Sequence, residues 1–234
     1  MKQSDVATHI SQQFNEELEE IRHSVLSMGG LVEQQLADAV TALLSLNPEL
    51  AELVIEKDTR INELELKIDE ECTRILALRQ PTASDLRLVI GVFRIITDLE
   101  RMGDEAAKVA RMGLDLSLMN ASNKTYLEME NLTSHVIQMV NQSLDSFARM
   151  DAETALQTAR IDKRVDREYE AITRQLITLM MEDPRNVRHF IDVIWAARAI
   201  ERIGDHARNI CEQVIYIVRG TDIRHSDIIY RDRS

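Results

Sequence analysis

The amino-acid sequence predicts an all-α protein made of six helices in two tandem, duplicated three-helix bundles. The first observation is that 234 residues include only 7 glycines and 3 prolines, although 44% of the residues are hydrophobic. The second is that aromatic residues make up only 4% while methionines number 10, a composition typical of long helices with aliphatic cores. The third is an acidic motif that recurs after about 100 residues, a period too long for a solenoid unit and suited to a repeated bundle.

The few residues that interrupt helices mark the expected helix boundaries. Asn47-Pro48 and Asp183-Pro184 each place an N-cap side chain before a proline at the first helical position, and Gln80-Pro81 opens another helix. Asp151 is a further N-cap, and Gly220 ends the last helix. We therefore predict helices over residues 6–46, 48–79, 84–118, 126–150, 152–182 and 184–219.

The chain repeats itself at two slightly different offsets. An offset of 104 residues aligns Asp58 with Asp162, and an offset of 101 aligns ERMGDEA (100–106) with ERIGDHA (201–207). The polar stretch from Asn120 to Thr125 is the expected linker. The predicted domains are residues 1–120 and 121–220, followed by a polar, disordered tail over 221–234.

Pairs of acidic residues within the repeated motif share one helix face. Glu100 and Asp104 are four residues apart, as are Glu201 and Asp205, so each pair stacks along its helix. The helix phase places these side chains inside or beside the apolar arc. A carboxylate in that position costs several kcal/mol unless a cation or a proton meets it.

The preceding helix of each repeat supplies a matching pair. In an antiparallel hairpin with its turn at Pro81, Asp58 lies level with Asp104, and Asn62 lies level with Glu100. A turn between residues 183 and 184 produces the same pairing in the second repeat. The sequence therefore predicts two clusters: Asp58, Asn62, Glu100 and Asp104 in the first bundle, and Asp162, Asp166, Glu201 and Asp205 in the second.

Two interpretations of these clusters are open. Convergent oxygen ligands without sulfur suit a divalent or ferric metal, with Fe, Mn, Zn and Mg as candidates. In the alternative interpretation the acids form surface ion pairs with Arg60, Arg101, Arg164 and Arg202. Gly103 and Gly204 favour the metal, since a glycine inside a helix indicates close approach. The second cluster is expected to bind more strongly, because Asn62 removes one charged ligand from the first.

The overall charge and the cysteines restrict the possible functions. A net charge of -12 repels nucleic acid and anionic lipid, so neither is an expected partner. Cys72 and Cys211 lie in apolar helical patterns and are predicted to be reduced core residues. The first residues contain no apolar segment typical of a secretory leader, so none is expected, and no apolar run is long enough to span a bilayer. We expect a cytoplasmic protein that reaches a membrane only through partner proteins.

No motif points to catalysis. The sequence has no Gly-rich phosphate loop, nucleophile elbow or His–Cys pair. Glu20-x-x-His23 occurs once, whereas a di-iron bundle needs two such motifs, so we interpret it as a solvated helix face. Phe190 and Trp195 are expected to anchor a bundle core. The protein is not expected to be an enzyme.

Four segments together resemble the PhoU family of bacterial phosphate-transport accessory and regulatory proteins. They are MGGLVEQQL (28–36), RQPTASDLR (79–87), DLERMGDEA (98–106) and AIERIGDHA (199–207), and the resemblance covers essentially the whole chain. It implies a pair of three-helix bundles whose E/D-x-x-x-D motifs hold iron or other metals. Those motifs fall on the two clusters defined above, and Asn62 departs from them.

The resemblance also implies a function. A PhoU-like protein is expected to be a negative regulator of the phosphate regulon. It would be an adaptor between the high-affinity phosphate ABC transporter, with its ATPase PstB, and the PhoR-type sensor histidine kinase. A homodimer at the inner membrane is expected. The alternative is a metal-storage or redox carboxylate bundle, which is disfavoured because the clusters lie on a bundle margin and offer only oxygen ligands.

Overall fold

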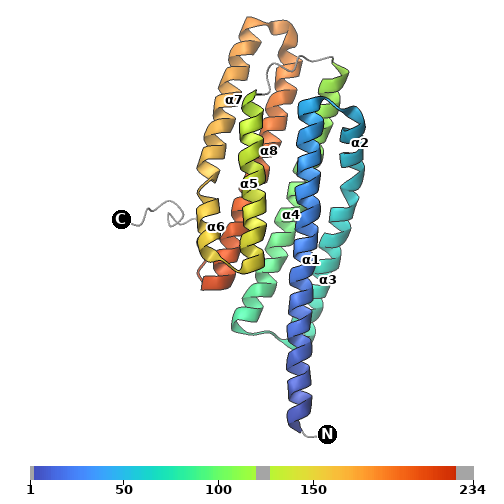
Figure 1. Cartoon of the computed structure of the whole chain (residues 1–234), viewed down its shortest axis with the longest axis vertical. Coiled ribbons are helices and arrows are strands. Elements are labelled where there is room, and N and C mark those ends of the chain that lie inside the picture. The colour runs from blue at the N-terminus through green and yellow to red at the C-terminus, as the bar shows by residue number, and fades with distance from the viewer. Residues whose placement is uncertain (1–2, 120–126, 225–234) are drawn as a thin grey trace, which may run out of the picture.

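The computed structural model describes residues 3–119 and 127–224, and within them the chain is helical with no strand (Figure 1). In chain order the elements are α1 (Gln3–Ser45), α2 (Pro48–Lys57), α3 (Thr59–Arg79), α4 (Ala83–Leu118), α5 (Leu127–Arg149), α6 (Ala152–Ala159), α7 (Asp162–Glu182), the 3₁₀ turn η2 (Pro184–Asn186) and α8 (Val187–Arg219).

The helices form two groups that meet along α4 and α8. One group contains α1, the consecutive helices α2 and α3, and α4, and the other contains α5, α6 with α7, and α8 (Figure 1). The helices α4 and α8 lie against each other in the middle of the molecule and run in opposite directions (Figure 1). The predicted all-α fold of two duplicated bundles is confirmed.

Two of the six predicted helices are interrupted. The helix predicted over 48–79 breaks at Asp58, and the one predicted over 152–182 breaks at Arg160 and Ile161. Neither break contains glycine or proline. Asp58 keeps right-handed helical angles of φ -58 and ψ -36, so the backbone stays helical in conformation at this break. The two breaks occupy matching places in the repeats, directly at the first acid of each cluster.

The capping predictions are confirmed with one adjustment. The Leu50 amide donates to Asn47 Oδ1 at 3.0 Å, and the Glu153 amide donates to Asp151 Oδ1 at 2.9 Å. Gly220 ends α8 with a φ of 70°, a left-handed conformation that suits glycine. Asp183 caps the 3₁₀ turn η2, so the α-helix itself begins at Val187 rather than at residue 184.

The described residues share one continuous hydrophobic core that runs through both bundles. Cys72 and Cys211 are buried and free within it, as predicted, and Phe190 is buried. The prediction for Trp195 is wrong, because its side chain is 62% exposed on the solvent-facing side of α8. No helix in the two described ranges combines the length and hydrophobicity needed to cross a membrane.

The predicted linker and the predicted tail lie wholly or mostly outside the described residues. The predicted linker, residues 120–125, lies outside the described residues. Of the predicted tail, residues 221–224 are described, and Ile223 there is only 3% exposed and joins the core.

A buried polar seam fixes the register between α4 and α8. His206 Nδ1 lies 2.8 Å from Asp98 Oδ1, and Arg202 Nη1 lies 2.7 Å from Glu105 Oε1. Glu105 and His206 occupy the same position of the repeated motif, so the two copies of the motif face each other across the seam. This arrangement directs the paired acids of each motif, Glu100 with Asp104 and Glu201 with Asp205, toward the outer helices α3 and α7.

Candidate functional site

The first cluster gathers residues from three helices around the break at Asp58. Gln35 of α1 donates from Nε2 to Asp58 Oδ1 at 3.0 Å, and Gln35 is only 5% exposed. Gly103 of α4 completes the contact, because a Cβ there would lie 3.2 Å from Gln35 Oε1 and 3.4 Å from Asp58 Oδ1. The glycine therefore lets both side chains approach α4 closely, as its place inside a helix predicted.

Carboxylates dominate the electrostatics of the first cluster. Burial raises the pKa of Glu100, and Asp104, Glu65 and Asp58 raise it further. Burial also raises the pKa of Glu65, which lies about one turn after Asn62 in α3. Arg101 is the cation that opposes these effects at both residues.

Two buried oxygen atoms beside these acids have no hydrogen-bond partner among the described residues. They are Gln35 Oε1 and Asn62 Oδ1. Buried oxygens are normally matched by a donor or a cation, so this cluster still has acceptor capacity to fill.

The second cluster is arranged around two arginines. Asp162 is 1% exposed and accepts a hydrogen bond from Arg208 Nη1 at 2.6 Å. Arg208 Nη2 also lies 3.6 Å from Asp205 Oδ1, so one guanidinium sits between two of the predicted ligands. Arg198 Nη1 donates to Glu201 Oε1 at 2.6 Å.

The carboxylates of the second cluster are close enough to perturb one another. Burial, followed by the charge of Asp205, raises the pKa of Glu201 to about 7 even though Arg198 opposes the shift. Burial raises the pKa of Asp162 although Arg208 lowers it, and burial with Asp205 raises the pKa of Asp166. The structure therefore brings all four predicted residues into one mutually repelling group that arginines hold together.

The side chains as they stand do not form a ready metal centre. Within residues 3–119 and 127–224, no three His, Cys, Asp or Glu side chains gather closely enough to hold a metal ion. In the second cluster a metal would have to displace Arg208 from Asp162. In the first cluster, the positions that match Arg208 and Arg198 are Ala107 and Thr97. Its carboxylates and partnerless amide oxygens are the ligand types that a hard cation prefers. Glu201 Oε2 of the second cluster is also buried without a partner, so the clusters differ in their arginines: a metal at the first cluster has no guanidinium to displace.

Sequence reasoning named the acids but missed their surroundings. Among the expected ion-pair partners, Arg164 contacts Glu168 at 3.0 Å and Arg202 contacts Glu105, so neither neutralises a cluster. The arginines that do so, Arg198 and Arg208, lie three residues from Glu201 and Asp205, a spacing that predicts contact on a helix. Gln35 and Glu65 were also missed, and no spacing signal connects Gln35 of α1 to Asp58.

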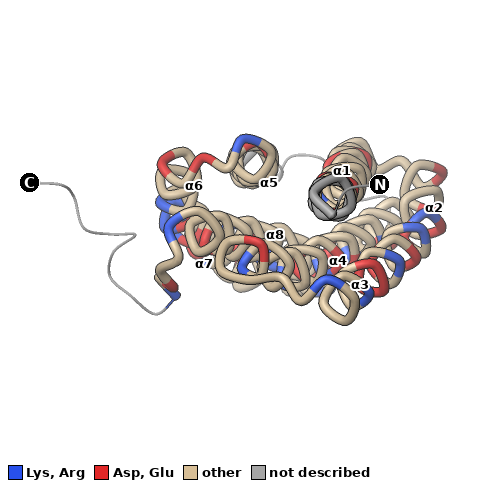
Figure 2. Tube along the Cα trace, turned by 90° about the horizontal axis from the view of Figure 1, so that it is seen from below, with Lys and Arg blue, Asp and Glu red and all other residues tan. Residues whose placement is uncertain are grey.

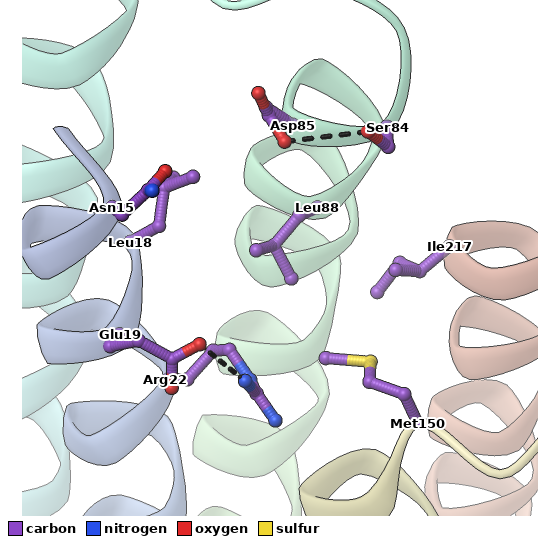
Figure 3. Close-up of a pocket in the computed structure, with 9 residues that line it drawn as sticks. All are labelled: Asn15, Leu18, Glu19, Arg22, Ser84, Asp85, Leu88, Met150 and Ile217. Atoms are coloured by element: carbon purple, nitrogen blue, oxygen red, sulfur yellow. Dashed lines mark hydrogen bonds and ion pairs between the residues drawn. The ribbon is translucent and has the colours of Figure 1, made fainter. Parts of the chain in front are cut away.

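A separate cavity of about 440 Å³ lies between the bundles, and no residue of either cluster lines it. Figure 3 shows its lining residues. Within it Arg22 Nη1 donates to Glu19 at 2.6 Å, and Ser84 donates to Asp85 at 3.4 Å (Figure 3). Arg22 Nη2 also donates to the carbonyl of Ala148 at 3.0 Å, which links α1 to α5. The lining residues are Asn15, Leu18, Glu19, Arg22, Ser84, Asp85, Leu88, Met150 and Ile217. Arg22 therefore connects the two bundles at the wall of this cavity.

Comparison with known proteins connects both halves of the chain to one family. The model of the PhoU domain matches twice, over residues 25–112 and 129–214. The Pseudomonas aeruginosa protein called phosphate-specific transport system accessory protein PhoU homolog is 56% identical, over 93% of this chain and 90% of its own length. The Escherichia coli (strain K12) phosphate-specific transport system accessory protein PhoU is 51% identical, with the same two coverages of 93% and 90%.

Solved structures agree with this similarity. The crystal structure of PhoU from Pseudomonas aeruginosa superposes with a TM-score of 0.87 at 55% identity, covering 89% of this chain and 100% of that one. The phosphate transport system regulatory protein PhoU from Streptococcus pneumoniae superposes with a TM-score of 0.83 at 32% identity, covering 89% and 98%.

Proposed function

The chain belongs to the PhoU family, and we propose that it acts as a phosphate-transport accessory protein that represses the phosphate regulon when phosphate is plentiful. In this role it is an adaptor between the phosphate ABC transporter, through its ATPase PstB, and a PhoR-type sensor histidine kinase. The observation that carries the proposal is similarity over nearly the full length of relatives named as accessory proteins of phosphate transport. We further propose a cytoplasmic homodimer that meets the inner membrane through these partners.

An adaptor acts by contact, and the geometry supports such a mode of action. The two acidic clusters lie toward the outer helices of the paired bundles, and the seam between α4 and α8 holds them in fixed register. A change of charge at either cluster would therefore alter the surface locally, while the helices around it keep their positions. Such a surface suits recognition of a partner's charge, since electrostatic complementarity favours the right partner over wrong ones.

We propose that metal binding, where it occurs, belongs to the first cluster. Asp58, Glu100 and Asp104 would be the charged ligands, and Gln35 and Asn62 would add amide oxygens. A divalent or ferric ion there would neutralise the acids that α3 and α4 bring together. This order reverses the expectation from ligand charge alone, because Arg208 and Arg198 already neutralise the second cluster.

The alternative of a metal-storage or redox protein has less support. Storage would use both clusters, yet the second has a guanidinium 2.6 Å from its most buried acid. Oxygen-only ligands also differ from the Glu-x-x-His sets of di-iron bundles.

The regulatory role is tested in a deletion strain grown at high phosphate with a reporter for the regulon. We expect the reporter to be derepressed without the protein and repressed again by the wild-type chain. A reporter that stays repressed in the deletion strain would remove the regulatory assignment.

Complementation with two matched variants then separates the clusters. The first is Glu100→Ala with Asp104→Ala, and the second is Glu201→Ala with Asp205→Ala. Partial restoration by both is expected, because most of the contact surface survives the loss of one cluster. Full restoration by both variants would show that the acidic clusters are dispensable for repression.

A further inference from the structure

The solvent-facing stripe of α8 is basic and contains an exposed tryptophan. Arg188, Ile191, Trp195, Arg198 and Arg202 follow one another at three- or four-residue spacing, and all are exposed. Trp195, the only tryptophan in the chain, is 62% exposed, and Ile191 is 40% exposed. A tryptophan left in water forgoes a large burial gain, so its exposure on a charged stripe calls for an explanation.

The neighbouring stripe of α4 extends this basic surface. Lys108 Nζ and Arg202 Nη1 lie 2.9 and 2.7 Å from the same oxygen of Glu105, so the two stripes adjoin across the seam. Because α4 and α8 are antiparallel, Arg111, six residues after Glu105, lies level with Trp195. We call the five cations of this surface the basic band: Lys108, Arg111, Arg188, Arg198 and Arg202.

The band is a narrow positive strip on an acidic protein of net charge -12. The helices α4 and α8 lie side by side between α3 and α7, on the side of the molecule away from α1 and α5 (Figure 2). The two acidic clusters lie where α3 meets α4 and where α7 meets α8, on either side of the end of the band that contains Arg202. Asp192 lies at one end of the band and is partly buried. Burial raises its pKa, and the charge of Asp115 raises it further.

We propose that the basic band binds an acidic helix of a partner protein, with an apolar side chain of that helix resting on Trp195 and Ile191. Charge complementarity supports this occupant, because the band attracts carboxylates, and Arg111 and Arg188 form none of the internal ion pairs that hold its other three cations. A helix about 10 Å wide fits a strip formed by two helices. Tryptophan and arginine are also the residues that most often dominate binding energy in interfaces.

A flat anionic membrane fits the same surface less well. Its headgroups would also press on the first acidic cluster, which lies beside the Arg202 end of the band, and be repelled by it. A partner helix meets the band without covering that cluster. This proposal does not depend on the role in phosphate regulation, since it concerns only the chemistry of the surface.

The test uses Trp195 as its own reporter. A synthetic helical peptide of glutamate and leucine is titrated into the full chain while tryptophan fluorescence is recorded. We expect a blue shift that weakens with salt, because binding covers the indole and depends on charge. Arg111→Glu combined with Arg188→Glu should weaken binding at least about tenfold, as charge reversal at an interface does. These two residues are chosen because Arg198, Arg202 and Lys108 also hold internal ion pairs.

Matched control variants on α3 distinguish binding at the basic band from non-specific attraction of the peptide to any exposed cation or apolar side chain. Lys67→Glu reverses an exposed cation of α3, on the side that bears Arg74 and its contact with Glu17 of α1. It should leave affinity unchanged. Trp195→Ser should weaken binding of a dye-labelled peptide, whereas Leu66→Ser, at 65% exposure on α3, should not.

Four results would overturn the proposal. One is equal binding of a lysine–leucine peptide, and another is equal weakening by Lys67→Glu. The third is a blue shift with phosphatidylglycerol vesicles but not with the acidic peptide, which would assign the band to membranes. The last is a blue shift of the protein alone that follows its dimerisation by light scattering, which would assign the band to a second copy.

Discussion

The two repeats place the same acidic motif in opposite electrostatic settings. Around Asp162 and Glu201 in the second bundle, Arg208 and Arg198 supply positive charge within hydrogen-bonding distance. At the matching positions of the first bundle the chain has Ala107 and Thr97. One cluster therefore carries its own counter-charge, and the other leaves room for an external cation.

The exchanges between the repeats are paired rather than scattered. Arg198 lies over the ring of Tyr169 at 5.5 Å, while the matching Thr97 lies beside Glu65, which matches Tyr169, and lowers its pKa. Likewise Gln35 contacts Asp58 in the first repeat, and its counterpart Met139 offers no such bond. Each cluster has thus diverged together with its neighbours.

The largest expected effect comes from removing the internal cation of the second cluster. Arg208→Met leaves Asp162 buried and unpaired, so we expect a loss of about 3–5 kcal/mol in the free energy of unfolding. Urea unfolding followed by Trp195 fluorescence and by circular dichroism measures it. Adding Asp162→Asn should recover most of the loss. An Arg208→Met protein as stable as the wild type would show that this ion pair does not hold the cluster together.

The second effect is a pH dependence centred on Glu201. Its pKa is raised from 4.5 to about 7 in the folded chain, so the folded state binds this proton more tightly than the unfolded state. The resulting stability is complete below pH 4.5 and is lost as the pH rises through 7. We expect Glu201→Gln to remove of the order of 2 kcal/mol from the pH dependence of metal-free protein. A profile unchanged by Glu201→Gln would contradict this assignment.

The same experiment on Glu100→Gln sharpens the contrast between the repeats. Burial and neighbouring acids raise the pKa of Glu100 too, so the sign of its effect is the same. Its change should be smaller, because Glu100 is only half-buried while Glu201 is buried. A larger effect at Glu100 would reverse the ranking.

The smallest effect is expected at Gln35. Gln35→Met copies the second repeat and removes a hydrogen bond to a carboxylate, so we expect a loss of about 1–2 kcal/mol in unfolding free energy. The reverse exchange, Met139→Gln, meets an Asp162 that Arg208 already pairs, and should not stabilise. Urea midpoints of both variants measure the two costs. Equal costs for Gln35→Met and Arg208→Met would erase the distinction between a neutral and a charged partner.

Much of the fold could be predicted because local signals coincide with it. Asn47, Asp151 and Gly220 act where capping rules place them, and the repeat identifies the duplicated bundles. The breaks at Asp58 and at Arg160 could not be predicted, since neither contains glycine or proline. Their positions depend on how the helices pack around each cluster.

The part of the site that could be predicted is the part that depends on residue spacing within and between neighbouring helices. Hairpin register brought the acids together, but the groups that decide their charge depend on contacts between helices. Gln35 reaches Asp58 from a different helix, and Arg208 turns toward Asp162 of α7 rather than toward solvent. Trp195 was expected in the core because it is aromatic, yet α8 turns that side outward.

Metal titration of chelator-treated protein by calorimetry tests the contrast between the clusters most directly, with Mn²⁺ as the probe. The wild type is compared with Glu100→Gln/Asp104→Asn and with Glu201→Gln/Asp205→Asn. We predict that the first variant loses the wild-type binding heat and that the second keeps it. Loss of binding in the second variant alone would contradict the account, because it would mean that a metal displaces Arg208 and prefers the cluster that carries its own counter-charge.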